Sequence, residues 1–333
     1  MHLAIVILNW NGEELLKSYL PSVLQNSEGY DIYVADNASN DNSIAFIKAN
    51  YPSVKIIQNS KNGGFAKGYN DALTQVDADI FCLLNSDVEV SKNWLQPILE
   101  AFEKIPNASI IQPKILDQKQ KDYFEYAGAA GGFIDQLGYP FCRGRIFQAL
   151  EKDEGQYNDT REIFWATGAC MFIKRSVFNE IGGFDEDYFA HQEEVDLCWR
   201  AKNAGHKVYY VGTSKVFHLG GSTLSNMNPK KTFLNFRNSL FSITKNLPRR
   251  KAFLIIIIRL LLDAVAAFRF IFQLKLKHSF AIIKAHLSFY KHFGKMYRKR
   301  EKANFILNYY ITKSVVWSHF VHQVNLFSAL VKD

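Results

Sequence analysis

One segment of this chain constrains its fold more than any other, because an apolar run passes directly into polar residues. Residues 80–84 are five consecutive apolar residues, too few for a free-standing helix and typical of a strand buried on both faces. Asn85, Ser86 and Asp87 follow at once. Open α/β sheets bind ligands at the carboxyl ends of their strands. We therefore expect Asp87 to hold a divalent cation there, with a plain polar turn as the alternative.

Further apolar runs alternate with helical patterns in the first 60 residues. Predicted strands cover residues 3–8, 30–35 and 54–57, and predicted helices cover residues 13–24 and 43–50. This alternation indicates βαβ units and a parallel sheet. The ends of neighbouring strands would then bring Asn9, Asp36 and Asp87 to one edge.

The turns after these strands limit which classes of function are compatible with the sequence. The first strand is followed by N-W-N-G-E-E rather than the G-x-G-x-x-G of a dinucleotide-binding fold, so a dehydrogenase is excluded. The second strand ends at Asp36-Asn37, where a carboxylate can accept a hydrogen bond from the N3–H of uracil or thymine or simply cap a turn. Gly63, Gly64 and Lys67 open a predicted helix, whose free N–H groups would suit a pyrophosphate or form only a turn.

A second group of carboxylates lies in the segment 181–200. A helix is predicted from Glu193, and acidic residues at a helix start are favoured by its dipole. They also suit catalysis, because a hydroxyl that attacks as a nucleophile must lose its proton, and a positioned carboxylate can accept it. Glu193, Glu194 and Asp196 are therefore candidate catalytic residues.

Four motifs in the expected order carry a family resemblance. They cover residues 6–12, 36–39, 62–66 and 83–87. Together they resemble the family 2 glycosyltransferases, in particular the rhamnosyltransferase-like branch, over about residues 1–240. The resemblance implies a GT-A-type α/β fold with a mostly parallel sheet flanked by helices. The family's D-x-D metal motif begins here with Asn85, which leaves Asp87 to carry the cation mostly alone.

The resemblance also implies roles for individual residues. His218, followed by a Gly-Gly pair, resembles the second metal ligand, so that Asp87 and His218 would hold Mg²⁺ or Mn²⁺. Glu193-Glu194 resembles an E-D pair whose second member is the base, and which glutamate reaches the acceptor stays open. The residues implied in binding a nucleotide-sugar donor are Asn9, Asp36, Asn37, Gly63, Gly64, Lys67 and Asn85.

The implied activity is an inverting sugar transfer in the synthesis of cell-surface polysaccharide. The donor would be a UDP- or dTDP-linked sugar, and the acceptor a hydroxyl of a glycan or lipid-linked glycan. A single displacement requires one base and no protein nucleophile. A sugar nucleotidyltransferase is an alternative, but it normally has a basic Gly-rich loop after the first strand. A catalytically inactive carbohydrate-binding or scaffold protein is another, but it would have lost these carboxylates.

The charge of the chain is divided unevenly. Residues 1–229 carry 20 Lys+Arg against 29 Asp+Glu, whereas residues 230–333 carry 20 against 3, within a net charge of +8. We therefore expect a catalytic domain over residues 1–240 and a basic helical region over 248–333 that meets an anionic surface. Its apolar content exceeds that of a nucleic-acid-binding arm, so no nucleic-acid partner is expected.

Two segments of the basic region are candidates for membrane attachment. Residues 252–274 could span a bilayer, but Arg259, Asp263 and Arg269 interrupt them at a high cost. Residues 280–297 repeat apolar positions at helical spacing beside a basic stripe, typical of a helix lying in the headgroup plane. An in-plane hairpin on the cytoplasmic face is expected first, then a single span, then a soluble interface. No signal peptide is expected, and the four cysteines indicate buried thiols in a reducing compartment.

Overall fold

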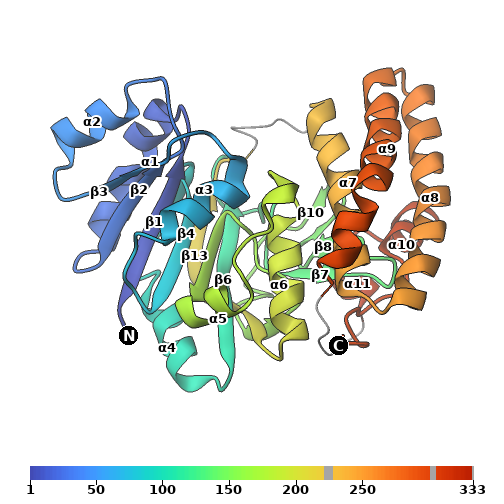
Figure 1. Cartoon of the computed structure of the whole chain (residues 1–333). Coiled ribbons are helices and arrows are strands. Elements are labelled where there is room, and N and C mark those ends of the chain that lie inside the picture. The colour runs from blue at the N-terminus through green and yellow to red at the C-terminus, as the bar shows by residue number, and fades with distance from the viewer. Residues whose placement is uncertain (221–227, 301–304, 332–333) are drawn as a thin grey trace.

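A mixed sheet of nine strands organises the computed structural model, which describes residues 1–220, 228–300 and 305–331 (Figure 1). The strands are β1 (Leu3–Asn9), β2 (Asp31–Asp36), β3 (Lys55–Gln58), β4 (Ile80–Asn85), β5 (Val88–Val90), β6 (Ala108–Asp117), β11 (Thr160–Ile163), β12 (Cys170–Lys174) and β13 (Lys207–His218). Their order is β11-β13-β6-β12-β4-β1-β2-β3, and β5 pairs with β13.

The parallel half of the sheet forms as the sequence predicts. Strands β4, β1, β2 and β3 are parallel and are connected through α1 (Glu13–Asn26), α2 (Ser43–Asn50) and α3 (Gly64–Leu73). The register pairs Asn9 with Asp36 and Leu8 with Asn85. The ends of these strands therefore lie side by side, and the predicted edge is confirmed.

The other half of the sheet is antiparallel in part. β12 runs antiparallel to both β4 and β6, and β11 runs antiparallel to β13. The apolar stretch over residues 163–173 is divided between two strands, since β11 ends at Ile163 and β12 begins at Cys170, and the two occupy different places in the sheet. Gly168 lies in the connection, where an added Cβ would come 2.8 Å from the ring of Phe65.

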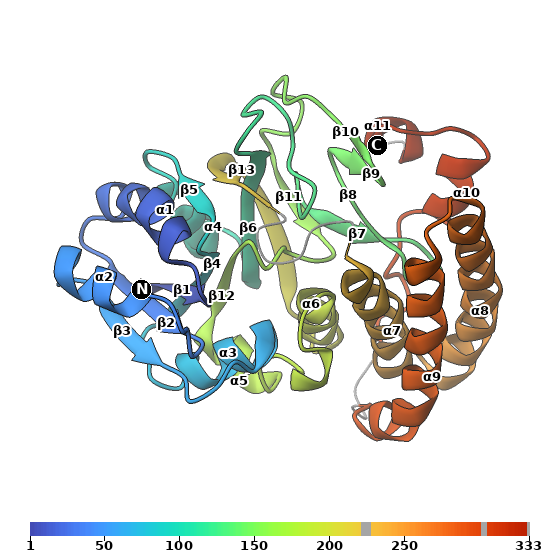
Figure 2. The ribbon, with the colours of Figure 1, turned by 90° about the horizontal axis from the view of Figure 1, so that it is seen from above.

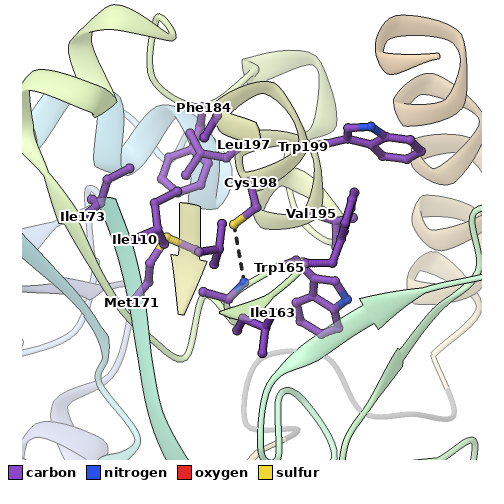
Figure 3. Packing of buried hydrophobic residues seen from close by; sticks show 14 of the residues in the cluster. Ile110, Ile163, Trp165, Met171, Ile173, Phe184, Val195, Leu197, Cys198 and Trp199 are labelled. Carbon is purple, nitrogen blue, oxygen red and sulfur yellow. Dashed lines mark hydrogen bonds between the residues drawn. The ribbon is translucent and has the colours of Figure 1, made fainter. Parts of the chain in front are cut away.

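Helices cover both faces of this sheet, and smaller elements extend it. Figure 3 shows α6 (Glu193–Asn203) packing Val195, Leu197, Cys198 and Trp199 among core residues of the sheet. Helix α5 (Arg175–Glu180) follows β12, and α4 (Gln96–Lys104) packs on β6 and β13. A small antiparallel sheet contains β7 (Gly132–Ile134), β8 (Pro140–Cys142), β9 (Arg145–Ile146) and β10 (Ala149–Leu150). The C-terminal α10 (Val315–Phe320) and α11 (Phe327–Leu330) follow, and Phe327 packs 5.3 Å from the ring of Phe133.

Three long helices form a separate layer beside the sheet (Figures 1 and 2). They are α7 (Pro229–Asn246), α8 (Arg249–Phe272) and α9 (Leu276–Arg298), and α9 lies between the other two. The predicted helical hairpin is therefore present as α8–α9. Helix α7 crosses residue 240, the expected domain limit, and packs on both α6 and α9.

Two of the charged residues inside α8, Arg259 and Asp263, point into the protein, whereas Arg269 is exposed. Arg259 and Asp263 are 2% and 1% exposed, with Arg259 Nε 3.6 Å from Asp263 Oδ1. The Arg259 guanidinium lies 3.7 Å from the centre of the Tyr139 ring, and His286 Nε2 lies 3.0 Å from Asp263 Oδ2. Within the described ranges, no helix combines the length and the apolar character that crossing a membrane requires.

Candidate active site

The ends of β1 and β2 bring buried polar side chains together. Asn9 Nδ2 donates a hydrogen bond to Asp36 Oδ1 at 3.1 Å, and the Ser39 backbone N–H donates to Asp36 Oδ2 at 3.0 Å. Both Asn9 and Asp36 are buried. Asn9 Oδ1 is buried without a hydrogen-bond partner among the described residues. A buried amide oxygen of this kind is ready to accept a hydrogen bond from a ligand.

The glycine loop before α3 is occupied by contacts within the protein. Asn37 Nδ2 and the Gly64 N–H both donate to Asn62 Oδ1, and the Phe65 N–H donates to the Phe189 carbonyl at 2.9 Å. Gly64 has φ +81°, and an added Cβ would come 2.4 Å from that carbonyl. The first N–H groups of α3 therefore face the chain itself rather than an open phosphate site.

Lys67, also expected near the donor's phosphates, is ion-paired in the structure. Its Nζ lies 2.8 Å from Asp71 Oδ1 and 3.7 Å from Glu186 Oε1. An added Cβ at Gly63 would collide with the Lys67 side chain. We assign Gly63, Gly64 and Lys67 to the packing of α3 against residues 186–189.

Asp87 and His218 meet because β5 pairs antiparallel with the end of β13. His218 Nε2 lies 3.2 Å from Asp87 Oδ1, and both side chains are buried. Two ligand atoms on adjacent corners of an octahedral cation, each at ~2.1 Å, are ~3 Å apart, so the pair fits Mg²⁺ or Mn²⁺. Asn85 Nδ2 lies 3.5 Å from His218 Nε2. In the part of the chain that is described, no group of three His, Cys, Asp or Glu side chains could hold a metal, so a donor diphosphate would have to complete the site.

Glu125 belongs to this cluster, although no sequence pattern indicates it. Glu125 Oε2 lies 3.3 Å from His218 Nδ1, on the side of the ring away from Asp87. A carboxylate behind a metal-binding histidine fixes the orientation of its ring. Burial by itself lowers the pKa of His218, but Glu125 and Asp87 outweigh it and raise the pKa to about 10. Glu125 lies in the region 107–160, where no motif identifies it.

The segment that leads into α6 is strained. Phe189, His191 and Gln192 have φ of 66°, 67° and 71°, a left-handed conformation that costs free energy for residues other than glycine. Asn238 Nδ2 of α7 donates to the carbonyls of Tyr188, Ala190 and His191 at 2.7–3.0 Å. Strain of this kind persists only where the surroundings impose it, and it gathers at functional sites.

Glu193 and Glu194 begin α6 at the end of this segment. Glu193 is buried and Glu194 is half-buried, and each has an Oε2 atom without a hydrogen-bond partner among the described residues. Burial raises the pKa of Glu194 to about 7. Burial, followed by the charge of Glu194, raises the pKa of Glu193 as well. The pKa of Glu194 matches base catalysis near neutral pH.

Asp196, the third candidate carboxylate, differs from Glu193 and Glu194 in its surroundings. It is fully buried; its Oδ2 accepts from Arg200 Nε and Lys245 Nζ, both at 2.8 Å, and its Oδ1 accepts from Asn246 Nδ2. Burial acts to raise the pKa of Asp196, but Lys245 and Arg200 outweigh it and hold that pKa well below its ordinary value. With its oxygens occupied, Asp196 anchors α6 rather than contacting a substrate.

The Asp87–His218 pair at the edge of the sheet and the two glutamates at the start of a neighbouring helix suit a metal-dependent glycosyltransferase of the GT-A fold. The glycosyl transferase family 2 model matches residues 4–182, more than half of the chain, and the chain belongs to this family. It is 28% identical over 235 residues to N-acetylglucosaminyl-diphospho-decaprenol L-rhamnosyltransferase of Mycobacterium tuberculosis, covering 65% of this chain and 75% of that relative. It is 26% identical over 221 residues to rhamnosyltransferase WbbL of Escherichia coli, covering 64% and 82%.

Solved structures agree on the fold. GalNAc-T7 with UDP, GalNAc and Mn²⁺ aligns with a TM-score of 0.59 and 18% identity, covering 75% of this chain and 49% of that one. The Pyrobaculum calidifontis mannosyltransferase PcManGT with GDP-Man and Mn²⁺ aligns with a TM-score of 0.54 and 10% identity, covering 87% of both.

Proposed function

We propose that this glycosyltransferase moves a sugar from a UDP- or dTDP-linked donor to a hydroxyl of a lipid-linked glycan, with inversion at the anomeric carbon. The observation that carries the proposal is the half-buried Glu194, whose pKa lies near 7 and whose Oε2 is without a hydrogen-bond partner among the described residues. The mycobacterial relative is named for a diphospho-decaprenol acceptor, which supports a lipid-linked acceptor here.

Each residue then has a defined task. Glu194 accepts the proton of the attacking hydroxyl, and Glu193, whose pKa is also raised by burial and by the charge of Glu194, lies beside it. Asp36 and the free Asn9 Oδ1 select a pyrimidine base through its N3–H. Asp87 and His218 would hold Mg²⁺ or Mn²⁺, which when bound neutralises charge on the leaving diphosphate.

A donor screen tests this proposal. The full-length protein is incubated with UDP-, dTDP- and GDP-sugars, with and without Mn²⁺, while its melting temperature and slow donor hydrolysis are followed. We expect metal-dependent stabilisation and hydrolysis with a uridine or thymidine donor. Equal effects with GDP-sugars would contradict the pyrimidine assignment, and effects independent of metal would contradict the cation site.

We further propose that the α8–α9 hairpin rests on an anionic membrane, on the cytoplasmic face, where lipid-linked acceptors are displayed. Its exposed apolar face consists of side chains that are each at least 40% exposed: Phe253, Leu254, Ile257, Ile258, Leu261, Val265, Phe268, Ile271, Phe280, Ile283, Leu287, Tyr290 and Phe293. Soluble monomers rarely expose contiguous apolar surface on this scale. The basic residues near it, including Arg250 and Lys277, complement anionic headgroups.

Vesicle flotation tests the membrane proposal. Full-length protein should float with vesicles of anionic phospholipid at low salt and less with purely zwitterionic vesicles, because basic residues contribute ~1 kcal/mol each near an anionic surface. Protein that stays at the bottom with both vesicle types, and sediments as a dimer without lipid, would assign the face to a second copy of this chain.

A further inference from the structure

Helix α9 contacts the segment that carries the catalytic glutamates. Lys295 Nζ lies 2.6 Å from Asp187 Oδ1. Lys299 is the residue that caps the end of α9. Its Nζ lies 2.5 Å from Asp185 Oδ1 and 2.7 Å from Asp187 Oδ2. Two lysines of the C-terminal layer therefore bind two aspartates that precede Glu193 by only six and eight residues.

The same aspartates are linked to the anchor of α6. Lys245 Nζ of α7 lies 2.6 Å from Asp185 Oδ2 and 2.8 Å from Asp196 Oδ2. A continuous chain of ion pairs thus runs from Lys299 through Asp185 and Lys245 to Asp196. It holds the chain at Asp185, before the left-handed residues of segment 185–192, and again at Asp196, after Glu193 and Glu194.

The ion pairs of Lys295 and Lys299, at the outer end of this network, contribute little to the stability of the whole fold. The Lys295 and Lys299 side chains are 51% and 34% exposed, and they border a cleft of about 520 Å³ together with Asp185, Asp187 and Lys245. Exposed ion pairs stabilise a fold by only ~0–1 kcal/mol each, and Asp185, whose side chain is buried, keeps Lys245 as a partner when Lys299 is removed. Removing the two lysines should therefore loosen the segment without unfolding the protein.

We propose that Lys295 and Lys299 are positioning residues for the catalytic base: they hold segment 185–192 in its strained conformation and so direct Glu194 at the acceptor hydroxyl. The proposal rests on the role of Glu194 proposed above. It makes the C-terminal layer a part of the active site's support, in addition to a surface for membrane attachment.

Kinetics of the full-length Lys295→Ala/Lys299→Ala variant test this inference. The assay is hydrolysis, with water as acceptor, of the nucleotide sugar selected in the donor screen. We expect kcat to fall ~10-fold or more, because small displacements of catalytic groups are costly, with KM for the donor nearly unchanged. Lys299→Arg should retain most of the activity. The matched control is Lys55→Ala/Lys104→Ala, which removes two exposed, ion-paired lysines elsewhere and should leave kcat unchanged.

A second comparison separates positioning of the base from a general structural effect. In a Glu194→Gln background the lysine substitutions should cause no further loss, since residues that act through one group are not additive. An equal loss in that background, or wild-type kcat in the double lysine variant, would overturn the proposal. Wild-type hydrolysis by Glu194→Gln alone would instead refute the proposed base. If the double variant melts early, Lys295→Ala alone, at the more exposed position, gives the same comparison.

Discussion

The parallel half of the sheet and the α8–α9 hairpin are both built from long apolar runs, yet they differ in what covers them. Strand β4 is buried along its whole apolar length, and β1 is buried except for the half-buried Leu8, because helices lie on both faces of the sheet. Helix α8 buries one side only and leaves Leu261 and Val265 more than 60% exposed. An apolar run therefore forms a core in one region and an exposed apolar face in the other.

The two regions also differ in whether their buried carboxylate and amide oxygens have hydrogen-bond partners. In the hairpin, Asp263 Oδ1 forms a hydrogen bond with Tyr139 Oη, and Asp263 Oδ2 forms one with His286 Nε2. Both carboxylate oxygens of Asp263 therefore have hydrogen-bond partners within the protein. Asn9 Oδ1 at the sheet edge and the Oε2 atoms of Glu193 and Glu194 at the start of α6 have no hydrogen-bond partner in the described ranges, and Arg259 Nε in the hairpin has none either. Buried acceptors without a partner are ready to accept a hydrogen bond from a ligand, whereas the satisfied oxygens of Asp263 indicate a structural role.

The sharpest test of this contrast compares Asp87→Asn with Asp263→Asn. Asp87→Asn should lower donor hydrolysis at least ~10³-fold, since metal charge stabilisation is worth several kcal/mol, and should remove the stabilisation by Mn²⁺. Asp263→Asn should lower the melting temperature while leaving kcat per folded molecule close to wild type. Full activity of Asp87→Asn, or of wild-type protein after exhaustive chelation, would refute the metal site.

Glu194→Gln should reduce kcat ~10²–10⁴-fold, the range for loss of a general base, while donor affinity measured by calorimetry is kept. The base must be deprotonated to act, so the wild-type rate should rise with pH through about 7, the pKa of Glu194. This dependence should vanish in Glu194→Gln. If Glu193→Gln is the more damaging substitution, the two roles are exchanged.

Leu261→Glu/Leu287→Glu tests the surface of the hairpin. Both leucines are about two-thirds exposed, so the fold should tolerate the charges. Binding to anionic vesicles should fall ~100-fold, because each leucine that enters the apolar phase contributes ~1.5–3 kcal/mol. Hydrolysis without vesicles should not change. Unaltered flotation would exclude this face as the membrane contact.

Asp36→Ala should weaken binding of free UDP or dTDP ~10–100-fold, the loss expected for a hydrogen bond to a charged group. Turnover at saturating donor should change much less, because Asp36 contacts the base and not the reacting atoms. Unchanged affinity in calorimetry would reduce Asp36 to a turn residue bonded to Asn9 and Ser39.

Glu125→Gln is expected to have the smallest effect, a ~10-fold weaker affinity for Mn²⁺, because the residue orients His218 without binding the metal itself. Titration of Mn²⁺ in the presence of UDP measures this directly, independently of turnover. An affinity equal to wild type would show that the ring of His218 is fixed by β13 alone.

The sequence alone determined the elements of the catalytic half. Strand–helix alternation predicted β1 to β4 and α1 to α3, and the polar residues after those strands predicted an edge that carries Asn9, Asp36 and Asp87. These features are local, since burial on both faces of a strand and a turn at its end are written in consecutive residues. The pairing of Asp87 with His218 was available only through the family resemblance.

Only the tertiary structure decided what several of these polar groups do. Asp196 belongs to a buried ion cluster because Lys245, 49 residues away, lies over it. Glu125 is brought to His218 by the pairing of β6 with β13, and Lys299 reaches Asp185 across 114 residues. The inward direction of Arg259 and Asp263 in α8 likewise depends on Tyr139, 124 residues before Asp263. Local patterns encode which faces are apolar, but the partner of a charge is set by packing between distant segments, and no periodicity in the chain records it.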